Sequence, residues 1–396
     1  MQFSVPTNWQ SDLIPGLVWD EVSELYGKLA VDFVGGGRAT AILDPVSLKK
    51  AFSHIDCAHK KGVKFNYLLN ATCLGNRELT KSGQKQIAKL VDWLVKAGAD
   101  SVTVSTPFML RFIKKNFSFL KVNISVQENI NSVRQAKMWY ELGADKITLS
   151  VLDVNRNFSL LKQIRAAVKC QLQLIANLKC LLGCPSYKYH ANINSHASQS
   201  KHMLKGYLID YCTLKCNFIR ISQPVEYIKS LWIRPEDVHH YEKIGIDSLK
   251  FVGRQMQTGS IHNIVKAYSK REYDGNLLDL LSSPRKSITI GGKKIFSYFN
   301  KFKYFFRPQY VSLFRIQKAR NLFPQEKIFI DNRLLDGFLE YFLENRCDFT
   351  CKPSCNYCYT IAEKVIKIDP AYQEKFKERL ENFLNDLYTG QAFYYF

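Results

Sequence analysis

Two pairs of cysteines in this sequence have a spacing that suits metal ligation. Cys180 and Cys184 follow an apolar run, residues 172–176, that is typical of a buried strand. Side chains just past the end of a strand lie where a barrel or open sheet presents its chemistry. The other pair, Cys212 and Cys216, has the same x3 spacing, which brings two sulfurs to one face of a helical turn or loop. We interpret the two pairs as one four-thiolate site for a 4Fe–4S cluster, with Cys73 as an alternative fourth ligand to Cys216. The first cysteine quartet is Cys180, Cys184, Cys212 and Cys216.

Three side chains that can move protons lie close after the first pair. They are Tyr187, His190 and His196. A lone histidine is more often structural than catalytic, but histidine can donate or accept a proton near neutral pH. Because two histidines and nearby tyrosines lie at a predicted site, a catalytic role is as well supported as a structural one. We therefore predict these three residues as catalytic candidates, with a structural role as the alternative.

The C-terminal region carries four further cysteines within twelve residues. A tight loop can fold every one of these sulfurs inward around one centre, so the pattern indicates a metal site. An iron–sulfur cluster is favoured over zinc, and unligated thiols are the remaining alternative. The last three cysteines also have the x3, x2 spacing of radical SAM enzymes, although those enzymes carry it at the end of the first barrel strand. The second cysteine quartet is Cys347, Cys351, Cys355 and Cys358.

The elements that must position these residues alternate between short apolar strands and amphipathic helices. The predicted strands cover residues 28–34, 64–69, 101–105, 122–126, 146–149, 172–176 and 248–252. Strands separated by single helices indicate a parallel sheet, and eight such units close into a barrel. The sequence therefore predicts an α/β protein with a TIM-like (β/α)8 barrel and a small C-terminal cysteine-rich module.

Polar residues recur where the predicted strands end. Three consecutive glycines and Arg38 follow the first predicted strand, and Asn70 follows the second. Because a barrel keeps its active site at this rim, we predict that these side chains contact substrate. Arginine suits an anionic substrate or oxygen donor through charge-assisted hydrogen bonds. The predicted substrate-binding residues are Arg38, Asn70, Arg156 and Arg254.

Length and charge suggest three regions. We expect the barrel in residues 1–281, a basic aromatic connector in residues 282–325 and the cysteine-rich module in residues 326–396. The net charge is +21, and ten basic residues lie between Asp279 and Glu326 with no acidic residue among them. Such a stretch would attract RNA or another anionic partner, although a solvated basic face with inward-packed aromatics explains it equally well.

Other compositional features exclude some classes of protein. The chain has no run of about 18 apolar residues, so no membrane span is expected. The first residues lack the basic start and apolar core of a secretory signal, and we expect a cytoplasmic protein. The eleven cysteines are therefore interpreted as metal ligands and buried thiols more readily than as disulfides.

Several segments resemble the peptidase family U32 (collagenase-like) proteins. They are residues 34–38, residues 65–70, the cysteine segment with His190, and residues 233–254. The resemblance implies a barrel that holds a 4Fe–4S cluster on four cysteines. It also implies an oxygen-independent hydroxylase, as in ubiquinone hydroxylation and in tRNA and rRNA hydroxylation, with prephenate as oxygen donor for some members. Some relatives act as pairs, which implies a partner subunit or electron donor. The second cysteine quartet is additional to this family pattern.

Together these features predict an iron–sulfur oxidoreductase that acts on an anionic small molecule or peptide. Oxygen-independent hydroxylation is the favoured reaction. An RNA-hydroxylating protein and a peptidase or peptide-modifying enzyme are the alternatives. No HExxH motif accompanies the peptidase alternative.

Overall fold

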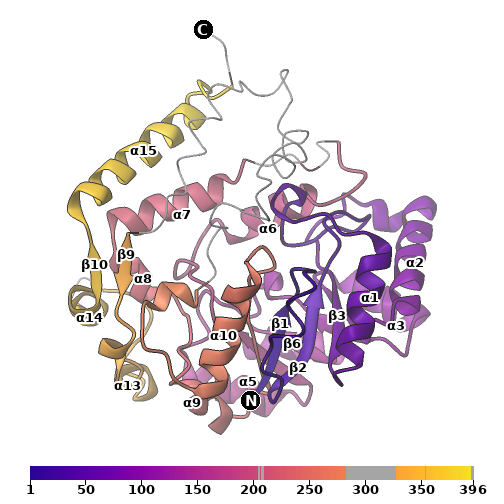
Figure 1. The fold of residues 1–396 in the computed structure, drawn as a ribbon, viewed down its shortest axis with the longest axis horizontal. Coiled ribbons are helices and arrows are strands. Elements are labelled where there is room, and N and C mark those ends of the chain that lie inside the picture. Colours follow the sequence, from indigo (N-terminus) through magenta and orange to yellow (C-terminus); the bar gives the residue numbers. More distant parts are fainter. Residues whose placement is uncertain (204–205, 207–208, 282–326, 353, 394–396) are drawn as a thin grey trace.

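Eight parallel strands close into a barrel in the computed structural model of the chain (Figure 1). The structure describes residues 1–203, 206, 209–281, 327–352 and 354–393. Each strand pairs with the next along the chain, and β8 closes the ring by pairing with β1. The strands are β1 (Gln2–Pro6), β2 (Val22–Gly27), β3 (Lys64–Leu69), β4 (Ser101–Val104), β5 (Lys121–Ile124), β6 (Lys146–Thr148), β7 (Gln171–Ile175) and β8 (Ser248–Lys250). The predicted TIM-like barrel is confirmed.

Helices surround the barrel, and polar caps mark where several of them begin. The side chain of the residue before each of five helices accepts a hydrogen bond from a backbone N–H in the first turn, which is the usual way to satisfy these groups. Each helix turns an apolar face onto the strands. The capped helices are α1 (Leu48–His59), α2 (Lys81–Lys96), α3 (Pro107–Asn116), α4 (Val133–Glu141) and α5 (Phe158–Ala167), and α9 (Val238–Lys243) and α10 (Thr258–Lys270) complete the ring.

The first predicted strand, residues 28–34, is wrong. This segment is a loop after β2, in which Lys28 pairs with Asp32 and Asp32 accepts a hydrogen bond from the backbone N–H of Gly35. The two strands that precede it were not predicted. They carry Ser4 and Glu24, which are buried in a polar barrel interior. No helix separates β1 from β2, so the alternation of strands and helices does not mark these two strands.

A buried histidine on α1 should make the stability of the barrel sensitive to acid. His54 on α1 lies 2.7 Å from the Thr7 hydroxyl and packs against Trp9. Burial, with a smaller effect of Lys50, lowers the pKa of His54 to about 4 from 6.5. The unfolded chain therefore binds more protons than the folded chain between pH 6.5 and 4. Stability should fall across this window by about 3 kcal/mol.

Urea unfolding of wild type and His54→Asn at pH 7 and pH 4 measures this effect. Wild type should lose about 3 kcal/mol more than the variant over this range, because the variant has no imidazole to protonate. Equal losses in both proteins would show that other groups cause the acid sensitivity. The variant's stability at pH 7 serves as its own baseline.

Besides α9, three helices of the described chain between β7 and β8 extend the last part of the barrel. They are α6 (Tyr187–His196), α7 (Tyr211–Ser222) and α8 (Val225–Lys229). The C-terminal segment packs on them, with α15 along α7 and α14 against α8 (Figure 1). This segment contains β9 (Ile328–Ile330), α13 (Glu340–Leu343), α14 (Tyr357–Val365), β10 (Ile366–Ile368) and α15 (Pro370–Tyr388).

One apolar core runs through the barrel and the C-terminal segment. Phe338, Phe342 and Val365 belong to the same buried cluster as the barrel strands. The cysteine-rich module is therefore packed onto the barrel. The predicted connector, residues 282–325, lies outside the described residues.

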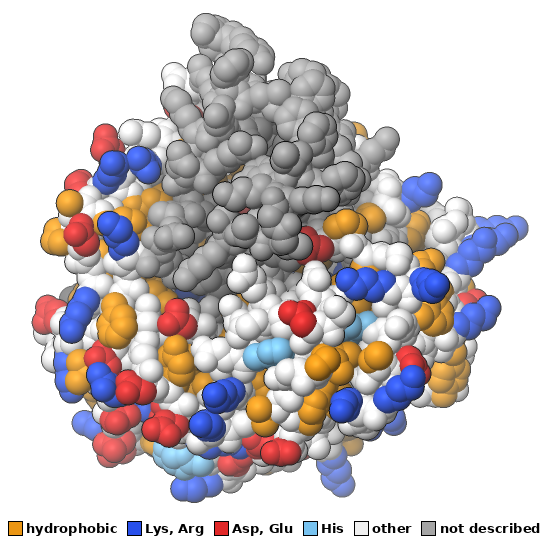
Figure 2. Space-filling model, viewed as in Figure 1, with side chains coloured by type: hydrophobic (Ala, Val, Ile, Leu, Met, Phe, Trp, Pro, Cys, Tyr) orange, Lys and Arg blue, Asp and Glu red, His pale blue; other side chains and the backbone are white. Residues whose placement is uncertain are grey.

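Charges of both signs are interspersed on the face shown in Figure 2. Lysine and arginine side chains alternate there with aspartate, glutamate and apolar groups. Within the described ranges, no helix is both long and apolar enough to cross a bilayer.

Candidate active site

The first cysteine quartet is gathered from two separate elements beyond the carboxyl end of β7. Cys180 and Cys184 lie in the loop that follows β7, and Cys212 and Cys216 lie on α7. Cys180 is within electrostatic range of Cys184 and Cys216, and Cys212 is within range of Cys184 and Cys216. The predicted proximity of the two pairs is therefore present in the fold.

An apolar surface lies under these thiols. Val151, Leu152, Ile175 and Val252, from the ends of three strands, form a small buried cluster against which Cys180 and Cys184 pack. Burial raises the pKa of Cys180 to about 12 and that of Cys212 to about 12. In the described parts of the chain, no three His, Cys, Asp or Glu side chains converge closely enough to ligate one ion. The sulfurs are neighbours without forming a single-ion site.

Arg220 is a buried cation beside this quartet, and the sequence-based prediction missed it. Its Nη2 donates to the sulfur of Cys216 at 3.2 Å, and its Nη1 donates to the carbonyl of Lys179 at 2.8 Å. The side chain is 3% exposed, and its Nε has no hydrogen-bond partner among the described residues. A buried guanidinium needs a negative partner. Four thiolates around a metal cluster would provide one, so the donor set and the charge both suit such a group.

The proton-moving candidates share α6, but their surroundings differ. His190 Nε2 lies 3.2 Å from a carboxylate oxygen of Asp210, the residue that caps α7. His196 stacks on His202 with ring centroids 4.8 Å apart. Tyr187 donates its hydroxyl to the carbonyl of Val126 at 3.0 Å. Tyr187 is within electrostatic range of Cys180.

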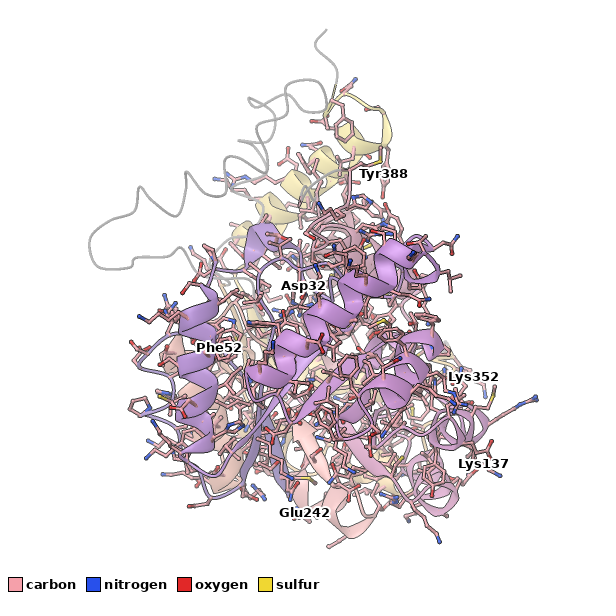
Figure 3. The ribbon with its side chains drawn as sticks, turned by 90° about the vertical axis from the view of Figure 1, so that its right-hand side faces the viewer. Asp32, Phe52, Lys137, Glu242, Lys352 and Tyr388 are labelled. Atoms are coloured by element: carbon pink, nitrogen blue, oxygen red, sulfur yellow. The ribbon has the colours of Figure 1, made fainter. Side chains whose placement is uncertain are left out.

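A second group of charges lies at the same end of the barrel, around the ends of β1, β2 and β8. Lys28 and Arg254 line a cavity of about 10 Å³, which holds about one water molecule. Lys28 pairs with Asp32, which also accepts the Tyr67 hydroxyl at 2.8 Å. Nη1 of Arg254 is buried without a hydrogen-bond partner among the described residues. Figure 3 shows Asp32 and Glu242 at opposite ends of the barrel.

Arg38 lies between the two groups. Its Nη1 donates to the carbonyl of Gly37 at 2.9 Å. It is within electrostatic range of Arg254 on one side and of Cys180 and Tyr187 on the other. Arg38 therefore carries positive charge near the thiols, and Arg254 adds positive charge on the side away from them, as an anionic substrate would require.

Comparison with known proteins identifies the family. Residues 38–182 match the model of Peptidase family U32. "Uncharacterized protease MJ1657" of Methanocaldococcus jannaschii is 32% identical over 337 residues, which cover 85% of this chain and 87% of that protein. The chain belongs to peptidase family U32. A solved structure, "The Structure of the U32 Peptidase Mk0906", is 18% identical with a TM-score of 0.49, covering 64% of this chain and 93% of that one.

The family match covers only part of the candidate site. The matched segment of this U32 protein includes Arg38, Asn70 and Cys180 and ends before Cys184. The helix α7, which supplies Cys212 and Cys216, lies beyond it. The arrangement of the quartet is therefore an observation on this chain, and the family match does not supply it.

Asn70 of the U32 protein supports the glycine-rich loop. Its Nδ2 donates to Ser125 at 3.1 Å, and its Oδ1 accepts from the backbone N–H of Gly37 at 3.3 Å. Gly36 donates its N–H to Ser198 at 2.8 Å, and a Cβ on Gly36 would lie 2.6 Å from the amide oxygen of Asn70. The glycines therefore permit close packing against neighbouring segments, and the backbone donors are already used within the protein.

Arg156 does not contact the mouth, so its prediction as a substrate-binding residue is wrong. It is 1% exposed and donates to the carbonyls of Ile228 and Ser230 at 2.7 Å each. Its guanidinium lies 4.7 Å from the ring centre of Phe338 in the C-terminal segment. The position of Arg156 after a predicted strand suggested that it lies at the open end of the barrel. The side chain instead turns outward, because the aromatic residues that enclose it come from a distant part of the chain.

The second cysteine quartet lines one pocket of the U32 protein. Cys347, Cys351 and Cys355 lie outside helices and strands, and Cys358 lies in α14. Cys358 is within electrostatic range of the other three. The spacing argument therefore placed these residues together correctly, whereas their metal remains a prediction.

Proposed function

We propose that this U32 protein is an iron–sulfur-dependent oxidoreductase that hydroxylates its substrate without molecular oxygen. A C–H bond would be replaced by C–OH, a two-electron oxidation. An anionic oxygen donor would supply the oxygen atom of the new hydroxyl and accept the two electrons. Prephenate is the donor that the family resemblance implies. The first cysteine quartet would hold the 4Fe–4S cluster, whose chemistry is redox.

The observation that carries this proposal is the position of Arg220. Two cysteine pairs from separate elements lie around one buried guanidinium, and that guanidinium has an unpartnered Nε. A protein with four unligated thiols there would bury a cation without a matching anion, which costs several kcal/mol. Thiolates on a metal cluster remove that cost and are tuned by such hydrogen bonds to sulfur.

The remaining side chains would bind and orient an anionic reactant. Arg38 lies near the thiols, and Arg254 and Lys28 add buried positive charge on its other side. The Asp210 carboxylate lies 3.2 Å from Nε2 of His190 and would orient the imidazole. Tyr187 packs on the apolar side of the quartet. Because the cavity beside Lys28 and Arg254 has a volume of about 10 Å³, side chains would have to move for a reactant to enter it.

Anaerobic purification tests the proposal through iron and sulfide analysis and the absorbance near 400 nm. Cys180→Ser and Cys216→Ser should each lose about four irons per chain, because one cubane is lost. Cys57→Ser, an exposed thiol on α1, is the matched control and should lose none. Unchanged iron in both quartet variants, or zinc as the bound metal, would refute the assignment.

RNA is the second candidate substrate because the net charge is +21. Salt-sensitive RNA binding that is lost when Lys293, Lys294, Lys301 and Lys303 are neutralised would support it. These lysines lie outside the described residues. Peptidase activity rests only on the name of the relative from Methanocaldococcus jannaschii. Absence of cleavage when the iron-loaded protein is incubated with a peptide library would remove it.

A further inference from the structure

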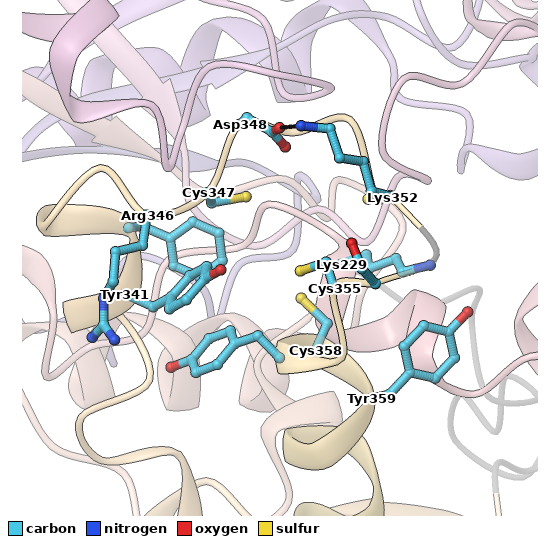
Figure 4. A pocket seen from close by; sticks show the side chains of 13 residues that line it. Lys229, Tyr341, Arg346, Cys347, Asp348, Lys352, Cys355, Cys358 and Tyr359 are labelled. Atoms are coloured by element: carbon cyan, nitrogen blue, oxygen red, sulfur yellow. Dashed lines mark ion pairs between the residues drawn. The ribbon is translucent and has the colours of Figure 1, made fainter.

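The C-terminal segment contains a pocket whose wall carries four sulfurs. The pocket has a volume of about 130 Å³ and is lined by the second cysteine quartet together with Tyr341, Phe342 and Tyr357. In Figure 4 the sulfurs of Cys355 and Cys358 lie close together, and the sulfur of Cys347 points toward the same space. Ordinary packing does not require four cysteines around one cavity, so the pocket has the character of a ligand site.

A buried cation lies beneath this pocket and points to a negatively charged ligand. Arg156 is within electrostatic range of Cys358 and Cys347. Its Nη atoms donate to backbone carbonyls in the last turn of α8 and just after it, while its Nε is buried without a hydrogen-bond partner among the described residues. The rings of Trp232, Phe338 and Phe342 lie 4.4–5.3 Å from its guanidinium carbon and shield it from water.

The carboxylate of Asp237 could pair with Arg156, but it already contacts another arginine. Asp237 is within electrostatic range of Arg156, but its oxygen lies 3.4 Å from Nε of Arg234. Neutral carbonyls and ring faces stabilise a guanidinium only in part. The anion that would complete the charge balance is therefore missing from the protein groups described around Arg156.

We propose that the second cysteine quartet binds an iron–sulfur cluster whose negative charge is partly balanced by buried Arg156. Four thiolates contribute four negative charges, so their complex with a doubly charged cubane core keeps a net charge of about −2. The cluster would join the C-terminal segment to the barrel through one electrostatic contact. This inference does not depend on the proposed function, because it uses different cysteines and a different arginine.

The pocket has room for a group larger than a single zinc ion. Zinc needs four sulfurs at about 2.3 Å from one point. Within the described ranges no three such ligands converge in this way, and the sulfurs instead border a cavity of about 130 Å³. Three of the four cysteines lie outside helices and strands. The loop can therefore adjust around a larger inorganic core without breaking a regular element.

Iron and sulfide analysis of full-length protein purified without oxygen tests the proposal. The Cys355→Ser/Cys358→Ser double variant should lose about four irons per chain, whereas Cys57→Ser should lose none. The Cys180→Ser/Cys216→Ser variant separates this site from the barrel site. If this variant retains iron and a variant with all four substitutions loses it, that iron belongs to the C-terminal pocket. The conclusion holds whether or not the barrel site binds a cluster.

Arg156 is tested as the counter-charge with Arg156→Met and Arg156→Lys. The methionine variant should release the pocket's iron to a chelator about 10-fold faster than the lysine variant, since second-shell partners change metal affinity by about 10- to 100-fold. If Arg156→Met fails to fold, the cysteine variants still decide the site. Zinc in place of iron, no metal in the pocket, or equal release from both arginine variants would overturn the proposal.

Discussion

Arg220→Met is expected to weaken iron binding by the first cysteine quartet about 10- to 100-fold, the range for groups that orient metal ligands. The wild-type guanidinium donates to the Cys216 sulfur at 3.2 Å and to Asn217 at 2.7 Å. It is also within electrostatic range of Cys180. Methionine fills a similar volume but supplies neither the charge nor the hydrogen bond. The rate of iron transfer to a chelator under anaerobic conditions measures the effect.

Two further variants make this test specific. Arg220→Lys keeps a positive charge and should release iron at a rate between those of wild type and Arg220→Met, because lysine lacks the planar fork of arginine. Arg134→Met removes an exposed arginine on α4 and should behave as wild type. If Arg220→Met keeps its iron as firmly as Arg134→Met does, Arg220 has a structural role only.

Glu24→Gln is expected to lower the free energy of unfolding by about 3–5 kcal/mol, the usual cost of removing one partner of a buried ion pair. Glu24 is 5% exposed and lies 3.2 Å from the ammonium of Lys146. It also accepts from the Ser4 hydroxyl at 2.6 Å. Burial alone would raise the pKa of Glu24, but Lys146, Lys250 and the hydrogen bonds bring it below its ordinary value. Without the carboxylate, the buried ammonium of Lys146 loses its ion-pair partner.

Urea unfolding at pH 7 measures this loss, with Glu344→Gln as the control. Glu344 pairs with Arg346 at 2.7 Å, but its side chain is 59% exposed. Removing such a surface pair should change stability by less than about 1 kcal/mol. Similar losses in the two variants would mean that water reaches the interior of the barrel and screens its charges.

Strand prediction succeeded where strands alternate with amphipathic helices. The predicted segments at residues 64–69, 101–105 and 172–176 match β3, β4 and β7 within two residues. Prediction failed at β1 and β2, which no helix separates and which place Ser4 and Glu24 inside the barrel. Their partners, Lys146 among them, come from strands far along the chain, so no local pattern shows that these polar groups are satisfied.

Prediction of the candidate site likewise succeeded for some residues and failed for others. Short spacing grouped the second cysteine quartet and the two cysteines of each pair in the first, whereas the fold brings those two pairs together from separate elements. Arg220 could have been found, since it lies four residues after Cys216 and such pairs share one face of a helix. The sequence could not show where the Arg156 side chain points. A residue that follows a barrel strand can face the open end of the barrel or turn outward, and its position in the sequence is the same in both cases.

The sequence by itself determined the barrel class, the family resemblance, the cysteine pairs of the first quartet and the whole of the second quartet, since these depend on local periodicity and short spacing. Only the tertiary structure decided which buried charge accompanies each group. Arg220 reaches the first quartet through one helix, whereas Arg156 is enclosed by Phe338 and Phe342, nearly two hundred residues away. The physical reason is that burying a cation is favourable only when distant segments together supply its partners and exclude water.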